Sequence, residues 1–266
     1  MTVTVERSGP VTTVILARPE ARNAMDPASA EALVEAFLAF DRDPEASVAV
    51  FWGAGGAFCA GWDLKYAGSL FGQPEPLKAL DFPDGAGPVP RGPMGPSRLE
   101  LTKPVIAAVA GPAVAGGFEL ALWCDLRVME EDAYFGVYCR RWGIPLIDGG
   151  TVRLPRLVGQ GRALDIILTG RKVTAEEAYR IGLAERIAPK HRSREVAEEL
   201  AQEIARFPQA CVRADRRSVY RAHGLSVAEG LRSEWQTSVH VVEEEGVAGA
   251  MRFASGKGRG GDFGAI

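Results

Sequence analysis

The first 190 residues alternate between short apolar runs and stretches in which apolar residues recur at helical spacing. The short runs are rich in Val and Ile and lie between turn residues, which predicts strands at 2–6, 11–16, 48–52, 105–109, 126–129 and 184–187. Apolar residues three or four positions apart predict helices at 30–40, 117–123, 151–158, 161–168 and 174–181. This alternation of strands and helices predicts an α/β fold.

Strand signals stop in the last third of the chain. Helical spacing there predicts helices at 193–207, 211–223, 227–245 and 247–254. We therefore predict two parts, an α/β body over residues 1–190 and a helical region over residues 191–266.

A segment rich in glycine and proline interrupts the body. Twelve of the 25 residues from Gly72 to Pro96 are Gly or Pro, which excludes a helix or a central strand. Loops of this length are usually functional or disordered. Two interpretations stay open, a flexible surface loop and a mobile flap over a binding site.

Composition and charge narrow the function classes. Hydrophobic residues make up 47% and charged residues 24%, so a chain of 266 residues can bury an ordinary globular core without disulfides. A net charge of -3 argues against a surface built for nucleic acid. No apolar run reaches the roughly 20 residues of a spanning helix. The first ten residues lack a secretory pattern, so we expect a cytoplasmic protein with no membrane partner.

Several catalytic classes lack their signature in this chain. The 4 cysteines form no CxxC pair and the 3 histidines have no zinc spacing, so we expect no bound metal. No GxSxG sequence is present, and every histidine lies in the C-terminal third, which disfavours a serine hydrolase.

Two loops that contain glycine are the candidates for chemistry. The first, Gly53 to Lys65, follows a predicted strand, and its glycines allow backbone N–H groups to point at a ligand. An ordinary strand-to-helix turn is the alternative. The second, Ala110 to Leu120, places a glycine pair at the start of an apolar helix, where free N–H groups favour negative charge.

Glu119 is a carboxylate inside that apolar helix. Burial would raise its pKa, and the helix N-terminus would oppose the rise. It is either a general acid/base or a capping glutamate satisfied by backbone N–H groups. The two loops together with a buried carboxylate suit an oxyanion hole with proton transfer, as in reactions through a thioester enolate.

Six segments, in this order and spacing, point to one known family. They are RPEARNAMD (18–26), AFCAGWDL (57–64), KPVIAAV (103–109), AGGFELALWCD (115–125), GGTVRLPRLVG (149–159) and LTGRKVTAEEAYRIGLA (168–184). Through them the chain resembles the crotonase (enoyl-CoA hydratase/isomerase) superfamily over residues 18–190.

The resemblance implies a fold, an assembly and a substrate. The fold is a spiral of ββα units with a C-terminal helical trimerisation region, so a homotrimer or a dimer of trimers is expected. The substrate is a CoA thioester. Coenzyme A then enters as part of the substrate, and no separate cofactor is implied.

The resemblance also implies roles for individual residues. Backbone N–H groups of Trp62 and Gly116 would hold the thioester oxygen, and the Trp62 ring would shape the acyl pocket. Glu119 matches the first of the two catalytic glutamates of hydratases. The family's adenine pocket maps to Arg22, Ala24, Ala60, Asp63 and Leu64.

The second hydratase glutamate is missing. Counting from Gly143 and Gly149 places Cys139 at its position in the substrate pocket. A buried cysteine with no histidine nearby in the sequence is usually inert. Asp148 is a possible substitute, because some superfamily isomerases and dehalogenases place a working aspartate within one residue of it. Its alternative is a turn residue that caps the helix at Thr151.

These features lead us to expect an acyl-CoA enzyme of the enoyl-CoA hydratase/isomerase type, a lyase or an isomerase. The alternatives are a CoA-thioester hydrolase, a dehalogenase, and a non-catalytic CoA- or RNA-binding homologue. A basic stripe could be a solvated helix face, a contact for CoA phosphates or an RNA site, and the acidic net charge disfavours RNA. Its residues are Arg213, Arg216, Arg217, Tyr220 and Arg221.

Overall fold

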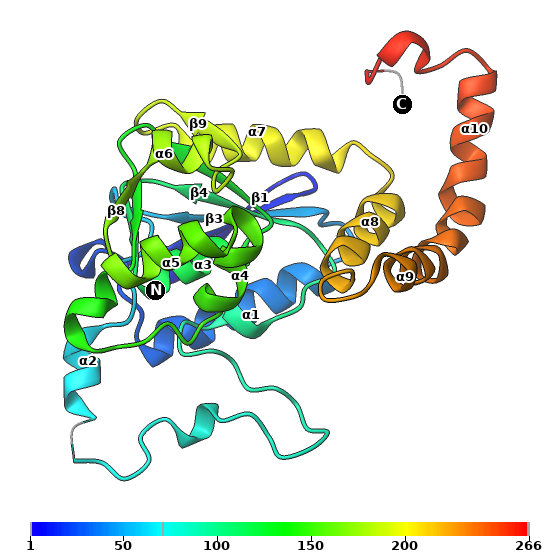
Figure 1. Ribbon diagram of the computed structural model, residues 1–266. Helices are drawn as coiled ribbons and strands as arrows, with labels where there is room; N and C mark the ends of the chain where they lie inside the picture. Colours follow the sequence, from blue (N-terminus) through cyan, green and yellow to red (C-terminus); the bar gives the residue numbers. More distant parts are fainter. Residues whose placement is uncertain (1, 71, 265–266) are drawn as a thin grey trace.

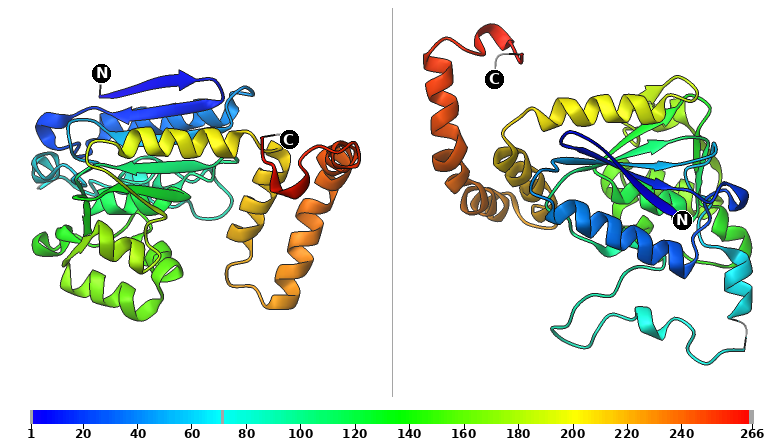
Figure 2. Two further views of the ribbon diagram at one scale, coloured as in Figure 1. Left: turned by 90° about the horizontal axis from the view of Figure 1, so that it is seen from above. Right: turned by 180° about the vertical axis from the view of Figure 1, so that it is seen from behind.

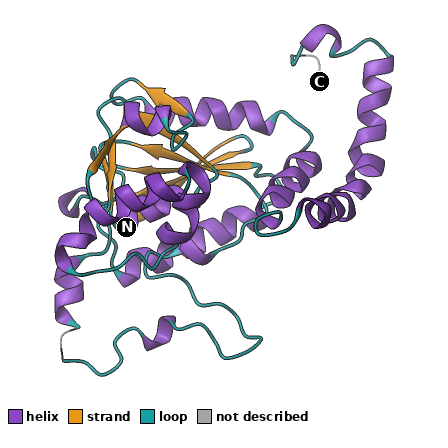
Figure 3. Ribbon diagram, in the orientation of Figure 1, coloured by secondary structure: helices purple, strands orange, loops and turns teal. Residues whose placement is uncertain are grey.

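The computed structural model describes residues 2–70 and 72–264, and their strands form two sheets (Figures 1 and 3). The larger sheet has the order β1-β2-β3-β4-β6-β9. The first two strands are antiparallel, and every other neighbouring pair is parallel. The strands are β1 (Val3–Ser8), β2 (Val11–Leu16), β3 (Val48–Gly53), β4 (Val105–Val109), β6 (Leu126–Glu130) and β9 (Arg186–Ala188).

The smaller sheet has the order β5-β7-β8. Its strands are β5 (Pro112–Val114), β7 (Tyr134–Gly136) and β8 (Lys172–Thr174). The sequence pattern did not predict them, because three residues are too few to show an alternation of period two. This sheet lies beside the start of α3 and supports the loops that follow the main strands.

The helices agree with the predicted positions, apart from α2, which the sequence pattern did not indicate. Asp26 begins α1 by accepting a hydrogen bond from the Ser29 N–H at 2.8 Å, and Pro27 occupies the first helical position. A π-helical turn (Val242–Gly246) joins α9 to α10. The helices are α1 (Pro27–Arg42), α2 (Leu64–Ser69), α3 (Gly116–Trp123), α4 (Gly150–Val158), α5 (Gln160–Thr169), α6 (Ala175–Arg180), α7 (Ser193–Ala205), α8 (Gln209–Arg221), α9 (Val227–Val241) and α10 (Val247–Ala254).

Helices cover both faces of the larger sheet, so its central strands are buried. On one face, Val48 and Val50 of β3 share a core with Ala197 of α7. On the other face, Phe51 of β3 meets Phe37 of α1 edge to face, with ring centroids 5.5 Å apart. Burial on both faces explains why these strands are continuous apolar runs rather than alternating ones.

Helices α8, α9 and α10, here called the arm, stand apart from the body, whereas α7 lies on the sheet (Figures 1 and 2). Asp125 fastens the arm to the body. Its Oδ1 accepts hydrogen bonds from Arg216 Nε at 2.8 Å and from the Tyr220 hydroxyl at 2.7 Å. Two members of the basic stripe, Arg216 and Tyr220, therefore form hydrogen bonds within the protein and are not simply a solvated helix face. Residues 265 and 266 of the predicted helical region lie outside the described residues.

The segment from Gly72 to Pro96 is exposed along most of its length and buried at its end (Figure 1). Residues 92–97 are all buried. The end of this segment is therefore part of the folded body and not a surface loop. Among residues 2–70 and 72–264, no helix has both the length and the apolarity to span a membrane.

Candidate active site

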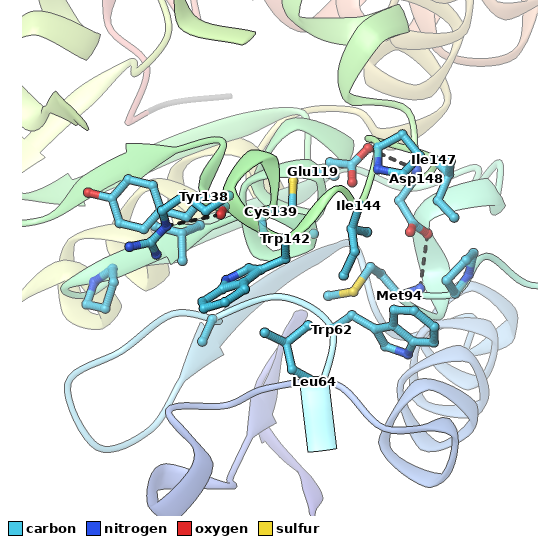
Figure 4. A pocket seen from close by; sticks show the side chains of 18 of the residues that line it. Trp62, Leu64, Met94, Glu119, Tyr138, Cys139, Trp142, Ile144, Ile147 and Asp148 are labelled. Atoms are coloured by element: carbon cyan, nitrogen blue, oxygen red, sulfur yellow. Dashed lines mark hydrogen bonds between the residues drawn. The ribbon is translucent and has the colours of Figure 1, made fainter. Parts of the chain in front are cut away.

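A pocket of about 310 Å³ opens between the loop before α2, the start of α3 and residues 138–148 (Figure 4). The carboxylates of Glu119 and Asp148 line it, together with the Cys139 thiol. The large apolar side chains of the lining are Trp62, Leu64, Met94, Trp142, Ile144 and Ile147. Sequence analysis placed Glu119, Cys139 and Asp148 at the site, the last two only through the family resemblance. It did not indicate the lining residues Met94, Tyr138, Trp142, Ile144 or Ile147, because residues in short or irregular segments carry no periodic signal.

Glu119 lies in the first turn of α3 and is only 2% exposed. Its Oε1 accepts hydrogen bonds from the backbone N–H of Asp148 at 2.9 Å and of Gly150 at 2.8 Å. Neither donor belongs to α3. Glu119 therefore does not cap α3, but its carboxylate is satisfied by backbone N–H groups, one in the turn before α4 and one in Gly150, the first residue of that helix.

Burial away from water is the main cause of the raised pKa of Glu119. Burial and the nearby Asp148 charge raise the pKa of its carboxyl group to about 7, against the lowering effect of the two N–H donors. At neutral pH the group is therefore present in both protonation states. A carboxyl group of this kind can both accept and donate a proton near pH 7.

The loop before α2 and the start of α3 are in direct contact. Gly61 has φ +92°, and a Cβ atom built on it would lie 2.8 Å from the Ala115 Cβ and 3.1 Å from the Gly116 nitrogen. Within the described residues, neither the Trp62 N–H nor the Gly116 N–H donates a hydrogen bond to another protein group. Two neighbouring N–H donors beside a pocket are suited to hold a negatively charged oxygen.

Cys139 faces the pocket near Glu119 (Figure 4). Burial raises the pKa of its thiol, and the Glu119 charge raises it further. The thiol is therefore uncharged at neutral pH. An uncharged thiol is a weak nucleophile and cannot take the role of a second carboxylate.

The Asp148 side chain accepts hydrogen bonds from residues outside the helix that follows it. Its Oδ1 accepts hydrogen bonds from the Met94 N–H at 3.0 Å and from the Ser97 hydroxyl. The N-cap of α4 is Gly149, with no side-chain hydrogen bond to the cap. The alternative in which Asp148 caps this helix is therefore wrong. Burial is the main cause of the raised pKa of its carboxyl group.

The residues mapped to an adenine pocket divide into two groups. Arg22, Ala60 and Leu64 line the pocket, whereas Ala24 and Asp63 lie outside its lining. Asp63 caps α2 by accepting a hydrogen bond from the Lys65 N–H at 3.0 Å.

Comparison with known proteins identifies the family of this chain. The sequence profile of the family described as enoyl-CoA hydratase/isomerase matches residues 6–80 and 96–256. The chain belongs to the enoyl-CoA hydratase/isomerase family. Enoyl-CoA hydratase EchA19 of Mycobacterium tuberculosis is 36% identical over 258 residues, covering 94% of this chain and 92% of the relative. Carnitinyl-CoA dehydratase of Salmonella arizonae is 39% identical over 228 residues, covering 85% of this chain and 83% of the relative.

Solved structures confirm the predicted crotonase fold. The crystal structure of enoyl-CoA hydratase EchA1 from Mycobacterium marinum is similar with a TM-score of 0.85 and 31% identity, covering 96% of both chains. A structure of enoyl-CoA hydratase from Mycobacterium tuberculosis H37Rv gives the same TM-score at 32% identity and 96% coverage of both chains. Residues 81–95 of this family member lie outside the ranges that the family profile matches.

Proposed function

We propose that this protein acts on an enoyl-CoA thioester and that Glu119 moves the proton. The observation that carries the proposal is the buried Glu119 carboxyl group in the pocket wall, where burial raises its pKa to about 7. Two N–H groups beside the same pocket supply the matching site for a thioester oxygen. We propose that the CoA part of the substrate lies along Arg22, Ala60 and Leu64, with no further cofactor.

The proposed reaction passes through an enolate. The thioester oxygen accepts hydrogen bonds from the Trp62 and Gly116 N–H groups, which stabilises the negative charge that forms there. The Glu119 carboxylate takes a proton from C2 of a 3-enoyl thioester, and the electron pair of the broken C–H bond moves onto the oxygen. Return of the proton to C4 shifts the double bond to the 2-position and restores the Glu119 carboxylate.

Isomerisation suits the site better than hydration, because one group can both take and return the proton. Hydration needs a second acid/base to activate water, and the Cys139 thiol is uncharged at neutral pH. Hydration with Asp148 as the second acid/base is the second candidate. Its support is that relatives 36% and 39% identical are named enoyl-CoA hydratase and carnitinyl-CoA dehydratase.

The test follows the absorbance of the conjugated enoyl thioester with 2-enoyl-CoA and 3-enoyl-CoA substrates. We expect a gain of absorbance from 3-enoyl-CoA, and a loss from 2-enoyl-CoA would identify hydration instead. Glu119→Gln should lower turnover by about 10²- to 10⁴-fold, the usual contribution of a general acid/base, while acyl-CoA binding persists. Glu176→Gln is the matched control, since Glu176 is an exposed residue of α6.

Other outcomes would redirect the assignment. Unchanged turnover in Glu119→Gln would contradict the role of this residue. Release of free CoA without a change in the double bond would indicate a thioester hydrolase. Binding of acyl-CoA without any reaction would favour the non-catalytic alternative.

A further inference from the structure

The end of the Gly/Pro-rich segment forms a closed turn, Gly92 to Ser97. The Gly92 N–H donates to the Gly95 carbonyl at 3.0 Å, and the Gly95 N–H donates back to the Gly92 carbonyl at 2.9 Å. Arg153 holds the far end of the turn, since its NH2 group donates to the Ser97 carbonyl at 2.8 Å. Unlike the exposed residues before it, this turn is buried and held by hydrogen bonds at both ends.

Asp148 contacts the same turn at two points. Its Oδ1 accepts from the Met94 N–H at 3.0 Å and from the Ser97 hydroxyl. The fit is close, because a Cβ atom built on Gly92 would lie 2.4 Å from this Asp148 oxygen. One buried carboxylate oxygen therefore fixes the middle and the end of the turn.

The turn places Met94 in the pocket wall, beside Gly116. Met94 is 1% exposed, and a Cβ atom built on Gly116 would lie 2.4 Å from its Sδ. Gly116 is the residue whose N–H is proposed to hold the thioester oxygen. Figure 4 shows the Met94 side chain between Trp62 and Ile144, on the side of the pocket opposite Cys139.

Met94 and most of the turn lie outside the ranges that the family profile matches. The family profile leaves out residues 81–95 and resumes at residue 96, so Ser97 and Asp148 lie in matched ranges while Met94 does not. Met94, which lies outside the matched ranges, thus forms part of the pocket wall. Asp148, which lies within them, holds it there.

We propose that Asp148 is a positioning residue, whose carboxylate holds the Gly92 to Ser97 turn so that Met94 closes the acyl end of the pocket. The substrate is then a short, apolar acyl group that ends at Met94. This inference rests on the proposed function, because it assigns the acyl part of the same pocket. It differs from the second candidate reaction, in which Asp148 itself exchanges a proton with the substrate.

The test compares binding of two saturated acyl-CoAs, butyryl-CoA and octanoyl-CoA, by calorimetry. Met94→Ala should raise the affinity for octanoyl-CoA relative to butyryl-CoA by about tenfold or more, since a misfitting methylene in an apolar pocket has an effect of this size. Ser97→Ala and Asp148→Ala, which remove these hydrogen bonds, should shift the ratio in the same direction by a smaller factor. Val89→Ala is the control, because Val89 is exposed in the same segment.

Further measurements distinguish a change in the affinity ratio from effects on folding and on catalysis. Thermal unfolding is measured for each variant, and Met94→Val replaces Met94→Ala if the latter does not fold. An unchanged affinity ratio in the folded Met94 variant would overturn the inference. It would also be overturned if Asp148→Ala lowered turnover equally for all chain lengths and left the ratio unchanged, with Ser97→Ala without effect.

The proposed function can fail separately. If the wild-type protein binds both acyl-CoAs but converts no enoyl-CoA, the proposed reaction is wrong, and the affinity ratio still tests the role of Asp148. If it binds neither acyl-CoA, both the proposed function and this inference are overturned.

Discussion

Glu119 should control the pH dependence of the reaction. The carboxylate is the form that takes a proton from the substrate, and the pKa of the group is about 7. We therefore expect kcat/KM for 3-enoyl-CoA to rise with pH through an apparent pKa of about 7 and then to level off. Initial rates across this range measure the profile, and Glu176→Gln should retain it. A profile without a rise near pH 7 would exclude Glu119 as the base.

The same raised pKa affects stability. The pKa of the Glu119 carboxyl group is 4.5 in the unfolded chain and about 7 in the folded protein. Between these pH values the unfolded chain has released a proton that the folded protein keeps. The free energy of unfolding should therefore fall as pH rises from about 4.5 to about 7, by up to about 3 kcal/mol, and level off above.

Glu119→Gln removes this titration and leaves the raised pKa of Asp148 in place. The difference in unfolding free energy between wild type and variant should therefore change with pH over the same interval. Denaturant unfolding at several pH values between about 5 and 8 measures it. Parallel curves for the two proteins would show that the pKa of Glu119 is not raised in the folded protein.

At the scale of elements, the site depends on the close approach of two backbones. A Cβ atom built on Gly117 would lie 2.0 Å from the Cys59 carbonyl oxygen, so α3 and the loop before α2 meet with no room for a side chain. Gly117→Ala should push them apart and separate the N–H groups of Trp62 and Gly116. Loss of one oxyanion donor typically lowers kcat by about 10²- to 10³-fold, and we expect a decrease approaching this range.

Gly161→Ala in α5 is the matched control, since a Cβ atom there would meet nothing within 4 Å. This variant should keep full activity, with stability unchanged or slightly increased. Steady-state kinetics and thermal unfolding measure both variants. A folded Gly117→Ala protein with normal kcat would contradict the proposed geometry of the oxyanion hole.

The sequence pattern predicted elements where burial leaves a signal, either a helical period or a continuous apolar run. The central strands are apolar throughout because helices cover both faces of the sheet, and Glu119 stands out as a charge in an apolar helix. The three-residue strands of the smaller sheet have no such signal. The bond between Asp148 and Met94 joins residues 54 positions apart, and Met94 lies in a Gly/Pro-rich segment without periodicity. Contacts of this kind are set by tertiary packing, so local patterns do not predict them.

At the scale of the whole molecule, the arm stands apart from the body (Figure 2) and carries exposed apolar side chains. Val227, Leu231 and Trp235 lie four residues apart on α9 and are 81%, 61% and 69% exposed. Residues at this spacing share one face of a helix, so they form an apolar stripe. Exposed apolar patches of this kind usually mark an interface with another chain. The hydrogen bonds of Asp125 to Arg216 and Tyr220 hold the arm so that this stripe stays accessible.

The resemblance to the crotonase superfamily implies a homotrimer or a dimer of trimers, and the exposed stripe leads us to expect that this assembly forms through the arm. Light scattering should give three or six times the chain mass of 28.5 kDa. Replacing Leu231 and Trp235 together by Glu places two charges in the stripe, and the cost of burying them should lower the measured mass toward that of one chain. Glu234→Gln, an exposed position of α9, should leave it unchanged. A wild-type protein that scatters as a single chain at micromolar concentration would contradict the assembly, and the stripe would then need another partner.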